Sequence, residues 1–373
     1  YTSQYTLSLH DALPIYRRLV LGGALGAAAS YLDGDWDCDR LADLFRVLLR
    51  SRASTGRFDR GAAARLATAA ARLGHRLRAN TPRCSKRNIR DNYDLGNDLF
   101  RLFLDDSMTY SAGIFDGTGT TLEAAQTEKL DRICRKLGLA PGQQVLEIGT
   151  GWGSFALHAA RHYGCHVTTT TISSEQHDLA AERVRAAGLE DRVEILLRDY
   201  RELTGRFDRL VSIEMIEAVG ADYLGTFFRA CSDRLKADGA MLVQAITTSE
   251  AEYPRYRRSV DFIQRYVFPG SHCPAPKALF AAVAAAGDLR PVHLEDIGED
   301  YAETLRHWRR RFHDAREAVR DLGYPERFLR LWDYYLQYCE AGFDEHHIGD
   351  LQLYLAKPDH PTPHLIAGAG GSR

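Results

Sequence analysis

The chain has 373 residues, of which 45% are hydrophobic and 26% charged, and its formal net charge is −2. These values exclude a mostly disordered chain, a collagen-like chain and a coiled-coil rod, and a length well above about 150 residues predicts two domains. The longest weakly polar stretch, residues 19–32, is shorter than the roughly 20 apolar residues that a membrane-spanning helix needs. Seven cysteines, with no C-x-x-C pair and no secretory signal, indicate reduced thiols and a cytoplasmic protein.

The first part of the chain is predicted to be a small helical domain. Residues 1–16 show no periodicity, and we interpret them as a non-native segment that is excluded from fold prediction. Residues 17–85 then form the domain, in which Leu41, Phe45 and Leu48 repeat at the spacing of one helix face.

A strongly basic block extends through the second half of this domain. Between Arg46 and Arg90, twelve arginines and Lys86 stand against a single acid, Asp59, which gives the segment a net charge of +12. Beside an acidic remainder, such a block favours an anionic partner, either lipid head groups or nucleic acid. A solvated helix face explains the same charges without any partner, and the pattern alone leaves both interpretations open.

From about residue 143 the pattern changes to short strands that alternate with helices, which is typical of a Rossmann-like, mostly parallel sheet with helices on both faces. Seven strands are expected, at residues 145–149, 166–171, 193–199, 209–215, 240–247, 292–297 and 351–356. Helices are expected at residues 152–162, 174–187, 223–235 and 277–286, with two more between the last two strands. We assign an α/β domain to residues 86–358 and a disordered, Gly- and Pro-rich tail to residues 359–373.

A glycine-rich turn joins the first strand of this series to its first helix. Glu147, Gly149 and Gly151 have a spacing that differs from the dinucleotide-binding G-x-G-x-x-G motif. The glycines let the backbone turn tightly and approach a ligand, and the following helix offers amide groups to a carboxylate. An acid at the end of the strand suits an ammonium group. The arrangement is that of the first motif in class I S-adenosylmethionine-dependent methyltransferases, so we expect that cofactor here.

Side chains after the next two strands are expected to complete the cofactor site. An acid that would grip the ribose at the end of the second strand is absent, and we assign Thr171, Ile172 and Gln176 to this place, two of which offer neutral hydrogen bonds. Asp199 and Tyr200 close the third strand and suit an adenine edge contact and an aromatic wall. A plain strand end with a helix cap, and a surface turn, are the alternatives without a ligand.

Seven blocks of sequence, several of them unrelated to cofactor binding, together resemble the cyclopropane-fatty-acyl-phospholipid synthases. The resemblance covers about residues 17–357. It implies transfer of a methyl group from S-adenosylmethionine to a cis double bond in a phospholipid acyl chain, followed by loss of a proton and closure of a cyclopropane ring. The blocks are residues 91–100, 108–111, 145–153, 171–176, 213–220, 266–270 and 297–305.

The resemblance also implies which residues act on the acyl chain. Members of the family hold a bicarbonate ion as the base, and the residues carried over to that site are Glu217, Ile246 and Tyr301. Two further positions depart from the family: Ala112 replaces a Cys but keeps the backbone amide, and Gln244 replaces a His and cannot titrate.

Tyr110 and Ser111, which precede the first of these departures, are assigned to the cofactor site by the same resemblance. The implied partner is a membrane surface of anionic phospholipids with unsaturated acyl chains, which a cytoplasmic protein reaches from the inner face without spanning the membrane. Nucleic acid is not expected, because no N-P-P-Y-type loop is present. The oligomeric state stays open, a homodimer included.

Three functions remain compatible with these residues. The first is cyclopropane formation. The second is methylation of the olefin without ring closure, which gives a methylene or, after reduction, a methyl branch. The third is a lipid- or cofactor-binding protein without catalysis, an interpretation that the two departures from the family motivate.

Overall fold

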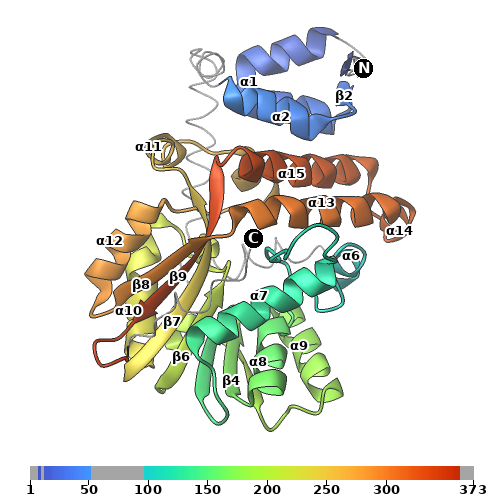
Figure 1. The fold of residues 1–373 in the computed structure, drawn as a ribbon. Coiled ribbons are helices and arrows are strands. Elements are labelled where there is room, and N and C mark those ends of the chain that lie inside the picture. Colours follow the sequence, from blue (N-terminus) through green and yellow to red (C-terminus); the bar gives the residue numbers. More distant parts are fainter. Residues whose placement is uncertain (1–6, 10–11, 52–95, 362–373) are drawn as a thin grey trace.

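The structure, a computed structural model, describes residues 7–9, 12–51 and 96–361. Its centre is a seven-stranded sheet in the order β5-β4-β3-β6-β7-β9-β8, in which β9 pairs antiparallel with both of its neighbours and the other pairs are parallel (Figure 1). The predicted Rossmann-like sheet is confirmed. The strands are β3 (Gln144–Ile148), β4 (His166–Thr171), β5 (Val193–Leu197), β6 (Phe207–Ile213), β7 (Leu235–Thr248), β8 (Arg290–Asp296) and β9 (Ile348–Ala356).

Helices cover both faces of the sheet, as the sequence predicted (Figure 1). Alternation along β3 explains how one strand serves both faces, because Val145 packs with α7 and α8 while Leu146 and Ile148 pack with α10 and α12. Within the described part of the chain, no helix has both the length and the apolar character needed to cross a membrane. The covering helices are α7 (Leu122–Leu137), α8 (Ser154–Tyr163), α9 (Ser174–Ala186), α10 (Leu224–Arg234) and α12 (Pro276–Ala286).

The α/β domain differs from the sequence prediction at several points: β7 begins at Leu235 instead of residue 240, three helices instead of two lie between β8 and β9, and two further differences affect the site. Helix α7 was not predicted, although Thr121 caps its first turn and Gly138 ends it in the left-handed conformation. Strand β6 was predicted to continue through Met215, but it ends at Ile213, and Glu214 adopts a φ of +48°. A side chain without glycine's freedom rarely takes this conformation, so the turn after β6 is a strained point of the backbone.

The chain between β8 and β9 forms a layer of helices above the sheet in Figure 1. Helices α1 and α2 lie on the side of this layer that faces away from the sheet. Its core is aromatic, with Trp308, Phe312 and Trp332 fully buried against Phe103. The helices of this layer are α13 (Gly298–Asp314), α14 (Arg316–Asp321) and α15 (Glu326–Asp344), with α6 (Asn97–Arg101) packed against its core and α1 (Ala12–Leu32) and α2 (Leu41–Arg50) on its far side. Short helical turns elsewhere in the chain are η2 (Tyr200–Glu202), η3 (Ile216–Ala218), η4 (Ala221–Tyr223), α11 (Tyr253–Tyr256) and η5 (Ile263–Val267).

Both ends of the described chain have more order than the sequence predicted. In the segment interpreted as non-native, β1 (Leu7–Leu9) pairs antiparallel with β2 (Trp36–Cys38), and α1 begins at Ala12. At the other end, His360 lies within the predicted disordered tail but is buried, and its ring contacts Tyr354. The predicted domain boundary at residues 85–86 lies outside the described residues.

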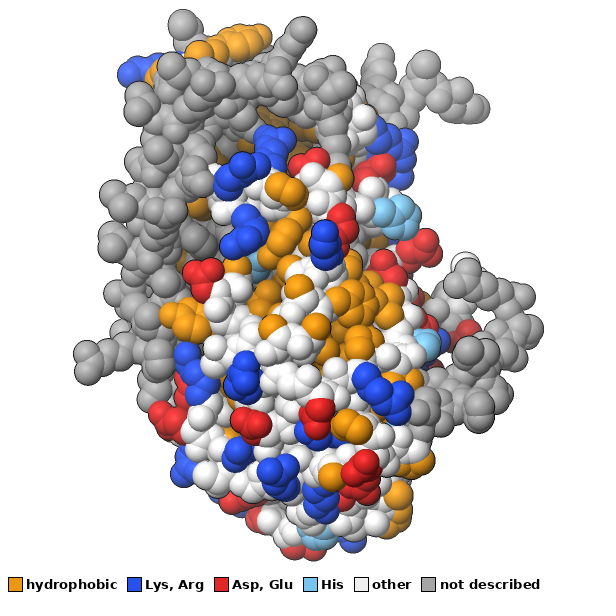
Figure 2. Space-filling model, turned by 90° about the vertical axis from the view of Figure 1, so that its left-hand side faces the viewer, with side chains coloured by type: hydrophobic (Ala, Val, Ile, Leu, Met, Phe, Trp, Pro, Cys, Tyr) orange, Lys and Arg blue, Asp and Glu red, His pale blue; other side chains and the backbone are white. Residues whose placement is uncertain are grey.

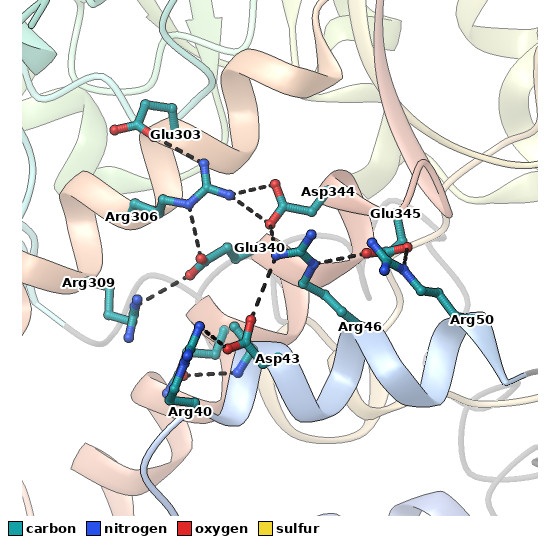
Figure 3. Close-up of polar contacts among 12 residues, drawn as sticks. Arg40, Asp43, Arg46, Arg50, Glu303, Arg306, Arg309, Glu340, Asp344 and Glu345 are labelled. Carbon is teal, nitrogen blue, oxygen red and sulfur yellow. Dashed lines mark hydrogen bonds and ion pairs between the residues drawn. The ribbon is translucent and has the colours of Figure 1, made fainter. Parts of the chain in front are cut away.

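The basic block is only partly described, because residues 52–95 fall outside the structure. Of its arginines, Arg46 and Arg50 lie on α2, and both form ion pairs with Glu345 at the end of α15 (Figure 3). On the face shown in Figure 2, Lys and Arg side chains are interspersed with Asp and Glu around a group of hydrophobic side chains. These two arginines therefore hold α2 against α15, and membrane docking by the rest of the block stays a prediction.

Candidate active site

A cavity of about 350 Å³ opens at the carboxyl ends of the central strands and brings together thirteen of the fifteen predicted site residues. This is the edge at which α/β sheets bind ligands. Ala112 and Gln244 do not line the cavity; both are fully buried behind it. The thirteen lining residues are Tyr110, Ser111, Glu147, Gly149, Gly151, Thr171, Ile172, Gln176, Asp199, Tyr200, Glu217, Ile246 and Tyr301.

The glycine-rich turn after β3 forms one wall of the cavity. Gly149 has a φ of +102°, and a Cβ atom there would lie 3.1 Å from the side chain of Met215, in the turn after β6. Gly151 has a φ of +52°, and no atom of the described residues lies within 4 Å of the position that its Cβ would take. The turn is therefore tightly packed at its first glycine and open at its second, where a ligand can approach the backbone.

Glu147 is buried beside this turn, and one of its carboxyl oxygens lacks a hydrogen-bond partner among the described residues. No described residue is hydrogen-bonded to its Oε2 atom. Burial raises the pKa of this carboxyl group to about 8, opposed by a hydrogen bond from Thr169 and by the charge of Lys129. A buried polar atom without a partner is costly, so this oxygen fits a ligand that brings a donor, as an ammonium group does.

The residues after β4 satisfy both interpretations of their sequence. Ser173 caps α9 by accepting a hydrogen bond from the Gln176 amide at 3.3 Å, as the interpretation without a ligand requires. The Thr171 hydroxyl also donates to the side-chain oxygen of Gln176 at 2.9 Å, so Gln176 keeps its amide nitrogen as a donor. Ile172 lines the cavity between them.

The residues after β5 form a second, more rigid wall. Arg201 donates to both carboxylate oxygens of Asp199, at 2.8 and 2.6 Å. The Tyr200 ring packs edge-on against Phe227 with the centroids 5.6 Å apart, and burial raises the pKa of its hydroxyl. Asp199 and Tyr200 are thus fixed in place at the cavity, as the predicted edge contact and aromatic wall require.

Glu217 and Ile246, to which the resemblance assigned a bicarbonate ion, are in direct contact with each other. The Ile246 backbone amide donates to Oε1 of Glu217 at 2.5 Å, while Oε2 has no hydrogen-bond partner among the described residues. Burial, and then the nearby Glu214 carboxylate, raise the pKa of Glu217 to about 8. Glu217 is therefore neutral at pH 7, a state suited to a carboxyl group that faces an apolar ligand.

The other three residues of the implied bicarbonate site converge on Glu214, which sequence analysis did not select. Its Oε1 accepts hydrogen bonds from the Ala112 backbone amide at 3.0 Å and from the Gln244 side chain at 2.8 Å. Its Oε2 accepts a hydrogen bond from the Tyr301 hydroxyl at 2.6 Å. The donors assigned to a bound anion thus hold a carboxylate of the chain itself.

A buried polar cluster supports this arrangement from behind. Lys129 of α7 donates to the Ser111 hydroxyl at 3.1 Å. Gln244 also donates to Asp350 at 2.8 Å and accepts from Gln352 at 3.1 Å, both on β9. Desolvation lowers the pKa of Lys129 to about 8. Sequence analysis missed this cluster because α7 was not predicted and no motif marks the two residues of β9.

Apolar side chains line the remainder of the cavity. They come from α2, α13 and α15, from the segment around η5 and from the first residue of β9, so the cavity runs from the sheet edge to the helical layer. Tyr110 belongs to this part, where its hydroxyl lies 2.8 Å from that of Tyr335. The apolar residues include Leu49, Ile263, Phe268, Leu305, Phe343 and Ile348.

Several known proteins are similar to this chain in sequence or in fold. The family described as mycolic acid cyclopropane synthetase matches residues 80–353. The tuberculostearic acid methyltransferase UfaA1 of Mycobacterium tuberculosis is 37% identical over 374 residues, covering 95% of this chain and 84% of the relative. The cyclopropane-fatty-acyl-phospholipid synthase of Escherichia coli is 36% identical over 344 residues, covering 91% and 84%. The structure of the mycolic acid cyclopropane synthase CmaA1, complexed with SAH and CTAB, is 28% identical with a TM-score of 0.68, covering 73% of this chain and 98% of that one.

Proposed function

This chain belongs to the mycolic acid cyclopropane synthetase family, and on that premise we propose that it methylates a cis double bond in the acyl chain of a membrane phospholipid, using S-adenosylmethionine, and closes a cyclopropane ring. One observation carries the proposal. A single cavity combines the glycine-rich turn and the unpartnered oxygen of Glu147 with buried carboxyl groups and an apolar extension.

The residues present fit the cofactor at one end of this cavity. When bound, S-adenosylmethionine supplies an electrophilic methyl group. We assign its ammonium group to Glu147 and its carboxylate to the amides of the turn at Gly149 and Gly151. Gln176 and Asp199 then meet the ribose and adenine from the neighbouring strands, with the Tyr200 ring as a wall.

The other end of the cavity suits an acyl chain. An alkene is a weak nucleophile, so the site must hold it close to the methyl donor and exclude water. Leu305, Phe343 and Ile348 provide an apolar surface for the acyl chain, and Phe268 also lines the cavity. Glu214 and Glu217 line the same cavity, and we assign their carboxyl groups to stabilising a carbocation formed from the alkene.

A methyl-branched or methylene product is the second candidate. It is favoured by the 37% identity to a relative named tuberculostearic acid methyltransferase. Both products start with the same methyl transfer and differ in where the cation loses its proton, so the residues that bind the cofactor do not distinguish them.

The test is an assay with purified full-length chain, cofactor labelled in its methyl group, and vesicles of phosphatidylglycerol with oleoyl chains. We expect label in the acyl chains, and NMR of the released fatty acids distinguishes ring protons from an exocyclic methylene. A ring establishes the first product and a methylene the second. Absence of label with intact cofactor binding would contradict both and favour a binding protein.

We also propose that the chain reaches its substrate at an anionic membrane surface through α1 and α2. Five of the large hydrophobic side chains that are exposed lie on these two helices: Tyr16, Val20, Leu21, Val47 and Leu48. The next residue of α2, Leu49, lines the cavity, so this apolar surface adjoins the end of the cavity assigned to the acyl chain.

A further inference from the structure

We propose that the Glu214 carboxylate is the base of the reaction and takes the place of a bound bicarbonate, so that turnover by this chain needs no added anion. This inference rests on the proposed function for the reaction itself, but the occupancy of the anion position is a property of the chain alone. In this proposal the Glu214 side chain itself supplies the negative charge that the family resemblance assigned to bicarbonate.

The hydrogen bonds around Glu214 carry the inference. Three donors from three separate parts of the chain, Ala112, Gln244 and Tyr301, end on its two oxygens at 2.6–3.0 Å. A small anion held by these donors would have to occupy the space that this carboxylate fills. The residues present therefore fit the side chain of Glu214 and do not fit a bicarbonate ion in addition.

The backbone explains how a glutamate reaches this position. With a φ of +48°, Glu214 turns out of β6 directly after the strand ends, and its own amide donates to the Gln244 carbonyl at 2.9 Å. A non-glycine residue in this conformation is strained and persists only where its surroundings hold it. The same turn places Met215 against Gly149, so the carboxylate is positioned relative to the cofactor turn.

The groups around Glu214 suit a base that must accept a proton. Burial raises the pKa of the Tyr301 hydroxyl, and the Glu214 carboxylate raises it further, so Tyr301 stays protonated and donates. Glu217, with a pKa of about 8, is neutral at pH 7.

The chemical step balances without a further reactant. The alkene carbon bonds to the transferred methyl carbon, and the bond between sulfur and methyl breaks with its electron pair on sulfur. The neighbouring carbon becomes a cation. Glu214 removes one proton from the new methyl group, and the released C–H electron pair forms the third bond of the ring. The protonated carboxyl group then returns its proton to water.

Two variants test the role of Glu214. Glu214→Gln keeps the shape and one acceptor but cannot take the proton, and Glu214→Gly empties the position. We expect wild-type turnover in carbonate-depleted buffer to equal that with added bicarbonate, and we expect each variant to lose about 100-fold or more, since positioned bases contribute about that much. Added bicarbonate should restore part of the activity of Glu214→Gly but none of that of Glu214→Gln.

A binding measurement makes the test independent of turnover. We expect ¹³C-bicarbonate to bind the Glu214→Gly variant and not the wild type, as seen by NMR line broadening. Bicarbonate binding by both proteins, or a Glu214→Gln variant that retains wild-type turnover, would overturn the proposal. If the wild type methylates no lipid, the proposed function is wrong. The NMR comparison still shows whether the Glu214 carboxylate or a bicarbonate ion occupies the anion position.

Two further measurements test whether the variants are correctly folded. Both variants should bind S-adenosylmethionine with wild-type affinity by calorimetry. Glu340→Gln, which neutralises a buried carboxyl group of α15 away from the cavity, should leave turnover unchanged.

Discussion

The buried carboxyl group of Glu147 links ligand binding to protonation. Its pKa of about 8 is set by burial, so the group is neutral at pH 6.5 when no cation faces it. An ammonium group beside the unpartnered oxygen favours the charged form. Binding of S-adenosylmethionine at pH 6.5, where the amino group of the free ligand already carries its proton, should therefore release about one proton.

Calorimetry in two buffers with different ionisation enthalpies measures this release directly. The Glu147→Gln variant should bind about 10-fold or more weakly, because it loses a charge-assisted hydrogen bond, and it should show the same heat in both buffers. Equal heats in the two buffers for the wild type at pH 6.5 would contradict the assignment of the ligand's ammonium group to Glu147.

At the scale of elements, an ion-pair network joins the two long helices of the upper layer to α2 (Figure 3). Arg306 of α13 donates to Asp344 with one nitrogen, at 2.5 and 2.7 Å, and to Glu340 at 3.1 Å. Because Glu340 is buried, Arg306→Met leaves it with only Arg309 nearby, 3.4 Å away. We expect a loss of about 2–3 kcal/mol in the free energy of unfolding.

Arg320→Met is the matched control for this prediction. Arg320 also pairs with two acids, Glu317 and Glu326, but these are exposed, so its replacement should change stability little. Urea denaturation of both variants at pH 7 gives the comparison. Equal losses would mean that burial of the acids does not decide the contribution of such pairs here.

Elements of the sheet were predicted with the right order and close boundaries, and the failures have local causes. Strand β4 (His166–Thr171) was predicted with its exact bounds, because it consists almost entirely of β-branched residues and is bounded by turn residues. The end of β6 was misplaced because Glu214 and Met215 continue an apolar and polar alternation, while contacts from Gly149 and Gln244 bend the chain away.

For the whole molecule, the exposed apolar residues of α2 predict how the enzyme docks on lipid. Val47 and Leu48 are 59% and 42% exposed, and negative charges introduced on the apolar surface that they form should oppose insertion into a bilayer. We expect Val47→Glu with Leu48→Glu to reduce sedimentation with phosphatidylglycerol vesicles at least about 5-fold, since each buried aliphatic side chain contributes about 1.5–3 kcal/mol.

Leu197→Glu provides the control, because this leucine is 55% exposed at the end of β5 and lies away from α1 and α2. It should leave vesicle binding unchanged, and all variants should keep wild-type cofactor affinity. Vesicle binding that survives the double change on α2 would assign docking to another surface.

The order of the strands and the place of the glycine-rich turn could be predicted from the sequence, because strand periodicity and glycine spacing act over a few neighbouring residues. The sequence also contained the family resemblance, from which Glu217, Ile246 and Tyr301 were named. The contacts of Glu214 with Ala112, Gln244 and Tyr301, which lie 102, 30 and 87 positions away in the chain, were visible only in the folded structure. Such a meeting depends on strand register and on one strained backbone angle, and neither leaves a local pattern in the sequence.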